Sequence, residues 1–209
     1  MTWVRTLEAS MEEARNGEPG KFTLDEVVPD SASDALSLEE LYWRYRGPIQ
    51  QYLYQLSGSA DQAEELAQET FIRACAGLLT FRGDCSVATW LFRIARNTFL
   101  NSLRRPTSTR VDTDELLAIP DSAGYGDPAG RYAATEQRNL MAIVLAELPE
   151  KQRTILLLRD GEGLAYAEIA DVLGISLASV KVNLFRACNA FRQTYESLTR
   201  AEGEDDDEL

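Results

Sequence analysis

Five side chains near the middle of the sequence have the composition of a surface for single-stranded nucleic acid. They are an aromatic residue, two arginines and two amides, and their spacings of 3, 4, 4 and 3 residues place them on one stripe of a helix. Aromatic rings stack on bases while cations follow the phosphate backbone, so the mixture suits an unpaired strand. The alternative is a packed tryptophan beside arginines that only solubilise the helix. The stripe consists of Trp90, Arg93, Asn97, Asn101 and Arg104.

A second candidate surface lies in residues 166–186, which have the pattern of a helix-turn-helix. Gly174 is suited to end a short first helix, and Ser176 is suited to cap a longer second one. Such a second helix lies in the major groove of DNA, where basic side chains reach phosphates or guanine. An ordinary helical hairpin with a solvated outer face is the alternative. The outward residues of the second helix are Ser179, Lys181, Val182, Phe185 and Arg186.

The residue types of this sequence give little indication of an enzyme active site or a metal site. The sequence contains no histidine, so it lacks the commonest general base and the commonest metal ligand. Cys75, Cys85 and Cys188 lie far apart, which argues against a disulfide framework or a zinc site. No paired-carboxylate motif stands out. We therefore expect a protein that is not an enzyme and that uses no metal and no cofactor.

The net charge of −13 argues at first against a nucleic-acid-binding protein. However, the acidic excess lies in residues 1–36, 107–136 and 199–209, whereas the blocks between them are near neutral. Phosphate binding depends on such local patches rather than on total charge. No apolar run is long enough to span a bilayer, and the N-terminus lacks a signal-peptide pattern. We expect a cytoplasmic protein without membrane insertion.

Apolar residues recur at helical spacing in two blocks, and no stretch alternates with period two, which predicts an all-α fold. A capping box at residues 37–40 opens the first helix, and Pro48 is expected to kink or break it. Helices are predicted over 61–78 and 86–104. In the second block, Pro149 is expected at the first position of a helix.

Residues rich in Gly, Pro, Ser and Asp separate the two blocks and have the composition of a flexible linker. The predicted organisation is therefore two small helical domains between acidic ends. In chain order these are an acidic N-terminal extension (1–36), a first helical domain (37–106), a flexible acidic linker (107–134), a helix-turn-helix domain (135–198) and an acidic, solvated tail (199–209).

Taken together, the motifs resemble those of extracytoplasmic-function sigma factors. Residues 67–74, 81–84 and 89–97 are similar to region 2 of this family. Leu148 and Pro149, followed by residues 168–170, 173–176 and 179–181, are similar to its region 4. The likeness covers about 37–105 and 135–198, and its motifs stand in the family's order.

The resemblance implies a subunit that directs RNA polymerase to promoters. Residues from Asp84 to Ser86 would capture a base flipped from the minus-ten element, and the Trp90 stripe would hold the adjacent strand. The helix-turn-helix would read the minus-thirty-five element. Implied partners are promoter DNA and core polymerase, through its β′ clamp coiled coil and β flap; an anti-sigma factor is left open. The residues expected to dock on the clamp are Glu65, Gln68, Glu69 and Ile72.

Three positions depart from the family pattern. Asn183 and Cys188 stand where arginines are usual, which predicts a thinly basic reading helix. Ala165 replaces a capping Ser or Thr, so the box with Glu168 is half complete. A stand-alone helix-turn-helix regulator is the competing hypothesis, although such a protein has no need for the Gln68 face or the Trp90 stripe.

Overall fold

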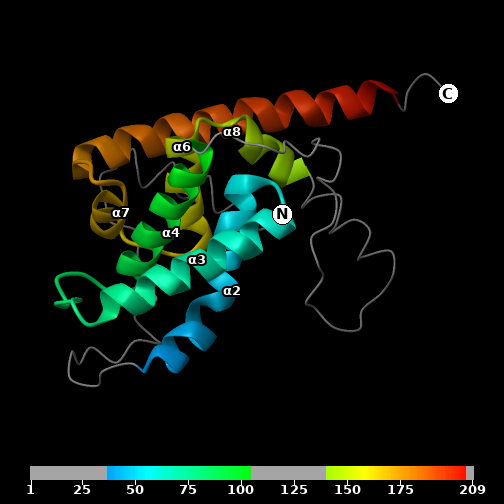
Figure 1. Cartoon of the computed structure of the whole chain (residues 1–209). Helices are drawn as coiled ribbons and strands as arrows, with labels where there is room; N and C mark the ends of the chain where they lie inside the picture. Colours follow the sequence, from blue (N-terminus) through cyan, green and yellow to red (C-terminus); the bar gives the residue numbers. More distant parts are fainter. Residues whose placement is uncertain (1–36, 105–139, 206–209) are drawn as a thin grey trace.

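The computed structural model describes residues 37–104 and 140–205, and every regular element in these ranges is helical (Figure 1). The predicted all-α fold is confirmed. The N-terminal extension and the predicted linker at 107–134 lie outside the described residues.

Three helices form the first domain: α2 (Leu38–Ser57), α3 (Ala60–Leu78) and α4 (Val87–Arg104). The capping box is confirmed, with Ser37 and Glu40 capping each other at the start of α2. The break expected at Pro48 is absent, because α2 continues through it. Ile49, Tyr52 and Leu53 follow the proline and are fully buried, so packing on this side stabilises the helix despite the missing N–H donor.

The second domain begins with a helix over residues 140–147, followed by α6 (Glu150–Leu156), a π-helical turn η3 (Leu157–Gly161), α7 (Tyr166–Leu173) and α8 (Leu177–Asp205). Pro149 is the N-cap of α6 rather than its first residue, so that prediction was wrong by one position. Helix α8 continues to Asp205, into the residues that the sequence predicts as an acidic tail. In Figure 1, α8 crosses the whole width of the molecule.

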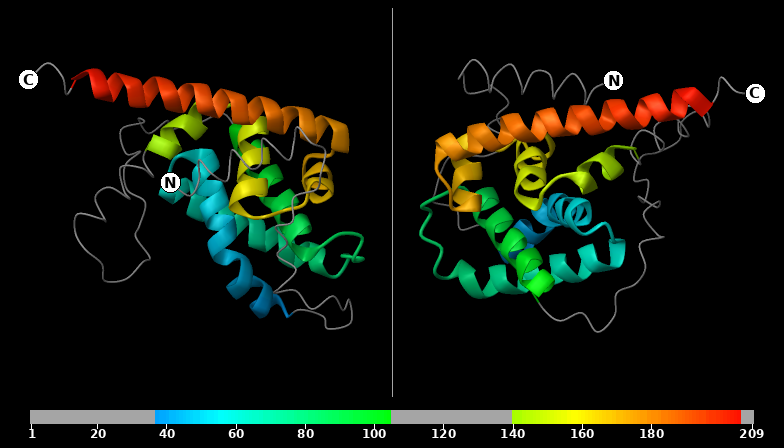
Figure 2. Two further views of the ribbon diagram at one scale, coloured as in Figure 1. Left: turned by 180° about the vertical axis from the view of Figure 1, so that it is seen from behind. Right: turned by 90° about the horizontal axis from the view of Figure 1, so that it is seen from above.

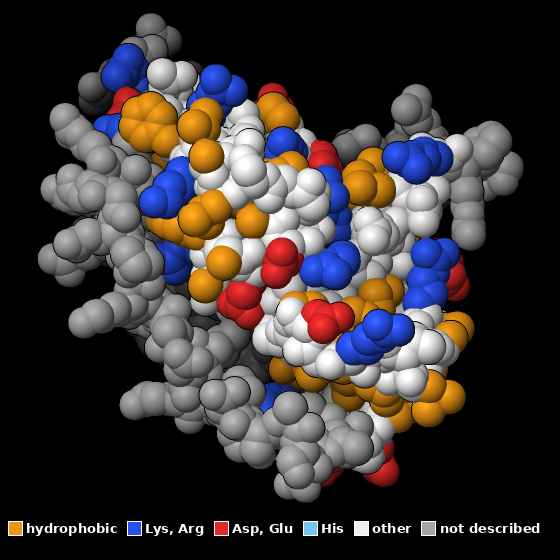
Figure 3. All heavy atoms as spheres, turned by 90° about the vertical axis from the view of Figure 1, so that its left-hand side faces the viewer, with side chains coloured by type: hydrophobic (Ala, Val, Ile, Leu, Met, Phe, Trp, Pro, Cys, Tyr) orange, Lys and Arg blue, Asp and Glu red, His pale blue; other side chains and the backbone are white. Residues whose placement is uncertain are grey.

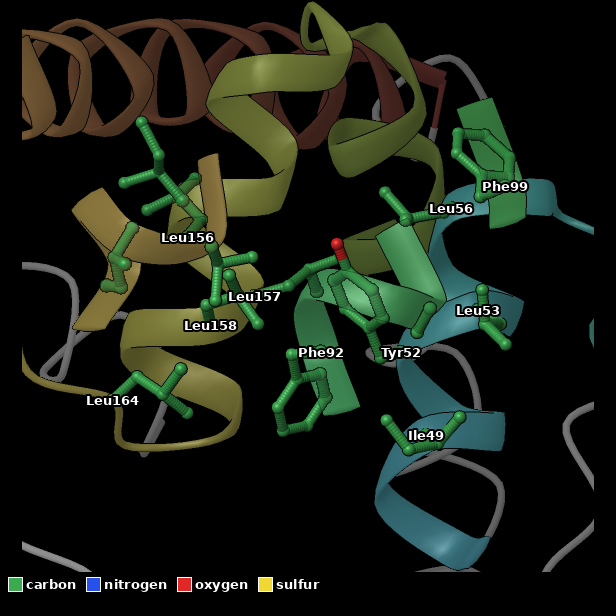
Figure 4. Packing of buried hydrophobic residues seen from close by; sticks show 14 of the residues in the cluster. Ile49, Tyr52, Leu53, Leu56, Phe92, Phe99, Leu156, Leu157, Leu158 and Leu164 are labelled. Atoms are coloured by element: carbon green, nitrogen blue, oxygen red, sulfur yellow. The ribbon is translucent and has the colours of Figure 1, made fainter. Parts of the chain in front are cut away.

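The two domains share one hydrophobic core rather than standing apart. Figure 4 shows Tyr52 of α2 and Phe92 of α4 beside the leucines of α6 and η3. The rings of Tyr52 and Phe92 meet edge to face with centroids 5.3 Å apart, and both are almost completely buried. Leu156 and Leu158 are also fully buried there. Because burial of each such side chain contributes about 1.5–3 kcal/mol, this contact is a substantial part of the fold.

The helix-turn-helix lies directly against the first domain. Helix α7 packs on α4 with one side and on α8 with another. In the right-hand view of Figure 2, α6 and α7 lie between α8 and the first three helices. The surfaces that the sequence assigns to different parts of a promoter are therefore neighbours in this structure.

Candidate nucleic-acid interface

The loop that follows α3 encloses a hollow against the N-terminal half of α4. Its volume is about 440 Å³. The rings of Phe81 and Trp90 lie in its wall with centroids 5.0 Å apart. Aromatic faces next to guanidinium and carboxylate groups can stack on a planar base and bond its edge. The hollow is lined by Gly77, Thr80, Phe81, Arg82, Asp84, Cys85, Trp90, Arg93 and Ile94.

Trp90 is held in place by close packing and is half-buried. A Cβ atom at Gly77 would lie only 3.0 Å from its ring atom Cζ2, so glycine is needed for this approach. The Trp90 ring therefore packs against its neighbours and also lines the hollow. On the same stripe Asn97 and Arg104 are exposed, and Asn101 is half-buried.

The helix-turn-helix has the predicted turn and caps. Gly174 ends α7 in the left-handed conformation with a φ of 65°, and the Ser176 hydroxyl accepts a hydrogen bond of 3.2 Å from the Ser179 N–H. The half-complete capping box is also present. Glu168 accepts from the Ala165 N–H at 3.0 Å, whereas the Ala165 methyl group can accept nothing.

The outward face of α8 is partly apolar. Val182 and Phe185 are about half exposed, at 49% and 46%, beside exposed Arg186. Ser179 and Lys181 are half-buried. The structure places Cys188 at 1% exposure, in the core, so its replacement of an arginine takes nothing from the reading surface. That part of the sequence interpretation was wrong, because Cys188 lies on the side of α8 that packs inward.

Basic side chains are not gathered into one field on this end of the molecule. Figure 3 views the end where α7, the start of α8 and the loop after α3 meet. Lysines and arginines lie scattered there among hydrophobic and acidic side chains. This end of the molecule therefore offers few clustered cations for phosphate binding.

The exposed stripe of α3 carries the residues predicted to dock on polymerase. Glu65 and Gln68 are exposed, and Ile72 is 65% exposed. Glu69 forms an ion pair of 2.7 Å with Arg73. The same stripe continues beyond the prediction through Cys75, Ala76 and Leu79, which are all exposed, and Leu79 reaches 96%. The spacing of three and four residues from Ile72 is the signal that finds them.

Two acidic residues of α7 contact the region of the hollow, and sequence reasoning missed both contacts. The Glu168 carboxylate accepts hydrogen bonds from the hydroxyls of Ser86, at 2.7 Å, and Thr89, at 2.9 Å. Arg93 Nε donates to the backbone carbonyl of Asp171 at 3.1 Å. No sequence pattern could have predicted these contacts, because 75 or more residues separate the two partners of each pair along the chain.

Burial raises the pKa of ionisable groups in both domains. Burial raises the pKa of the Cys85 thiol. The nearby Arg93 lowers this pKa, and the carboxylates of Asp171, Asp84 and Glu168 raise it further. Burial also raises the pKa of Glu162 to about 7.

Within the described ranges no cluster of Cys, Asp and Glu could hold a metal ion, and no helix is long and apolar enough to cross a membrane.

Comparisons with known proteins agree with the geometry. Residues 41–109 match the family Sigma-70 region 2, and residues 142–191 match Sigma-70, region 4. The RNA polymerase sigma factor YlaC of Bacillus subtilis is 36% identical over 72% of this chain and 87% of its own length. The ECF RNA polymerase sigma-E factor of Escherichia coli is 32% identical over 80% of this chain and 91% of its own.

Two solved structures share the fold. The sigma factor RpoE of Bartonella quintana, in complex with the anti-sigma factor NepR, gives a TM-score of 0.61 at 22% identity, over 76% of this chain and 96% of that one. CnrH in complex with the cytosolic domain of CnrY gives 0.56 at 20% identity, over 94% and 98%. With both sigma-70 regions in order and relatives at 36% and 32% identity over most of its length, the chain belongs to the extracytoplasmic-function sigma factors of RNA polymerase.

Proposed function

We propose that this sigma factor opens promoters by capturing a base of the minus-ten element in the hollow beside α4. The observation that carries the proposal is the composition of the hollow. Phe81 and Trp90 supply ring faces for a base turned out of the duplex, and Asp84 and Arg93 supply groups that bond its edge. The adjacent unpaired strand would follow α4 past Asn97, Asn101 and Arg104.

The minus-thirty-five element would be read by α8. Arg186 is exposed and can reach guanine or a phosphate, while Lys181 adds a second cation. Val182 and Phe185 are suited to contact thymine methyl groups, since both are exposed and apolar on the same side of the helix. Ser179 lies in the first turn of α8, where a recognition helix approaches base edges.

The exposed stripe of α3 would dock on the β′ clamp coiled coil of core polymerase in the cytoplasm, while region 4 would contact the β flap. We call this stripe the docking face and define it as Glu65, Gln68, Glu69, Ile72, Cys75, Ala76 and Leu79. Exposed apolar residues rimmed by polar ones are typical of a protein interface. Regulation by an anti-sigma factor is part of the proposal, because RpoE was solved with the anti-sigma factor NepR.

Permanganate probing of a promoter tests the role of the hollow, since this reagent marks unpaired thymines. The promoter is first mapped by sequencing transcripts after overexpression. Asp84→Ala should weaken opening by about 1–3 kcal/mol and relax base preference at one upstream position of the minus-ten element, because Asp84 is exposed and would bond the captured base. Glu196→Ala, an exposed change on α8, is the matched control. If Asp84→Ala leaves promoter opening and base preference unchanged, the hollow has no role in promoter recognition.

A further inference from the structure

We propose that the free sigma factor inhibits itself: region 4 closes over the minus-ten surface of region 2, and Glu168 binds the side chains that would receive the DNA strand. This inference rests on the proposed role of the hollow and α4. We call the arrangement the closed form, defined by the contacts of α7 with α4 and of α6 with α2 and α4.

One carboxylate carries the first contact. Glu168 Oε1 accepts from Ser86 and Thr89 at the N-terminus of α4, while its Oε2 accepts from the backbone of Ala165. Negative charge is favourable at the N-terminus of a helix, because the helix dipole is positive there. A phosphate of the unpaired strand would find the same attraction, so Glu168 and the strand compete for one position.

The second contact involves Arg93, a cation of the Trp90 stripe on α4. Arg93 lines the hollow, and its Nε donates to the carbonyl oxygen of Asp171 in α7. In the closed form this donor is already satisfied and α7 stands beside the hollow. Helix α7 must therefore leave α4 before an unpaired strand can reach Ser86, Thr89 and Arg93 together.

A third contact holds the domains together away from the DNA-facing residues. Arg96 of α4 forms two bonds of 3.1 Å with the Glu150 carboxylate of α6. Glu150 also accepts from Thr154, which is fully buried and lies 3.5 Å from the Tyr52 hydroxyl. The Arg96 and Glu150 side chains are only 13% and 27% exposed, so water screens this pair weakly.

Arg153 strengthens the same junction. It donates to the carbonyl of Leu56 in α2 at 3.2 Å and to the carbonyls of Ala146 and Leu148 in region 4. One guanidinium thus satisfies the C-terminal ends of helices from both domains. This junction can be loosened by mutation without touching the hollow or the reading face of α8.

The three native cysteines report on closure in the full chain. Cys85 lies in the hollow, half-buried and close to Glu168 and Asp171. Cys75 is exposed on the docking face, and Cys188 is buried inside region 4. Alkylation by iodoacetamide, followed residue by residue with mass spectrometry, should label Cys75 fast, Cys85 slowly and Cys188 only after unfolding.

Glu150→Lys should open the closed form because it sets two cations face to face in a partly buried site. We expect Cys85 to be labelled about 10-fold faster, which corresponds to ~1.4 kcal/mol, with Cys188 unchanged. Glu196→Lys makes the same charge change on an exposed site of α8 and should leave the Cys85 rate alone. The exchanged pair Arg96→Glu with Glu150→Arg should slow Cys85 labelling again.

Glu168→Gln is the second variant, for the case that Glu150→Lys also exposes Cys188 by unfolding region 4. Its amide oxygen can still accept from Ala165, so α7 keeps its cap while the charge at α4 is lost. Faster labelling of Cys85 in folded Glu150→Lys supports closure. Loss of the Glu168 charge also lowers the pKa of the Cys85 thiol, so Glu168→Gln supports closure only if labelling is faster at a pH where Cys85 is fully deprotonated in both chains. A Cys85 rate that equals the Cys75 rate in the wild-type chain, or that no variant changes, overturns it.

Addition of core polymerase separates this inference from the proposed function. Docking should protect Cys75, and the promoter-ready holoenzyme should expose Cys85, so the two rates move in opposite directions. Protection of Cys75 without faster labelling of Cys85 contradicts the self-inhibition while leaving polymerase docking intact. If Cys75 stays fully reactive, the docking face itself is wrong.

Discussion

The hollow of region 2 is walled by packed aromatic rings, whereas the reading face of region 4 consists of exposed side chains on one helix. Trp90 is fixed between Phe81 and Gly77, so its position requires no partner. Val182 and Phe185 on α8 are about half exposed, and the helix before them lacks a side-chain cap. The difference indicates that the hollow of region 2 is preformed, whereas the outward face of α8 has no comparable packing. We therefore expect region 4 to need polymerase to hold it against DNA.

Val180→Asp should have the largest effect, because it should unfold region 4. Val180 of α8 is fully buried, and an unpaired charge there costs several kcal/mol. Thermal unfolding followed by circular dichroism should show a large fall in melting temperature. Val182→Asp, two residues along the exposed side, is the control and should shift stability by less than about 0.5 kcal/mol. Equal effects of the two substitutions would mean that the faces of α8 are wrongly assigned.

Arg186→Ala changes only the outward face of α8, which is proposed to read the minus-thirty-five element. It should weaken minus-thirty-five recognition by about 1–3 kcal/mol if Arg186 contacts a guanine through two hydrogen bonds. Run-off transcription on promoters with intact and scrambled minus-thirty-five elements measures the loss, which should vanish on the scrambled set. Arg200→Ala, an exposed change near the far end of α8, serves as the control. Wild-type transcription by Arg186→Ala from every promoter with this element would contradict the assignment.

Ala165→Ser should make region 4 more stable without changing what it reads. The backbone at Ala165 is already extended, with φ −67° and ψ 153°, so a serine hydroxyl can accept from the third helical residue. The expected gain of about 1 kcal/mol corresponds to a rise of roughly 2–4 °C in melting temperature. The full chain is the right sample, because the two domains share a core. No gain would show that another acceptor already satisfies the N–H groups at the start of α7.

Glu69→Lys should affect polymerase binding more than folding. Its pair with Arg73 is about 40% exposed, so the loss of the pair should cost less than about 1 kcal/mol. Co-purification with core polymerase should decrease, while thermal unfolding stays near that of the wild type. Glu196→Lys carries the same charge change away from α3 and should bind polymerase normally. A variant that melts early yet binds polymerase normally would give Glu69 a structural role.

Local chemistry made much of this fold predictable. The capping box at Ser37, the left-handed Gly174 and the Ser176 cap each depend on neighbouring residues, and the structure contains all three. Of the kink or break expected at Pro48, the break does not occur, and Cys188 faces inward. Packing from other helices decides whether a helix continues through a proline and which side of it is buried. The bonds of Glu168 to α4 join distant parts of the chain, so no local pattern could reveal them.

The most direct test is to measure promoter binding by the chain alone and by the chain with core polymerase. A gel shift and run-off transcription at physiological salt should be performed on one mapped promoter. The net charge of −13 and the scattered cations predict weak, non-specific binding by the free chain. Specific binding and a defined transcript should appear only when both proteins are present. Tight, specific binding by the free chain, without any transcript on addition of core polymerase, would identify a stand-alone regulator and contradict the account.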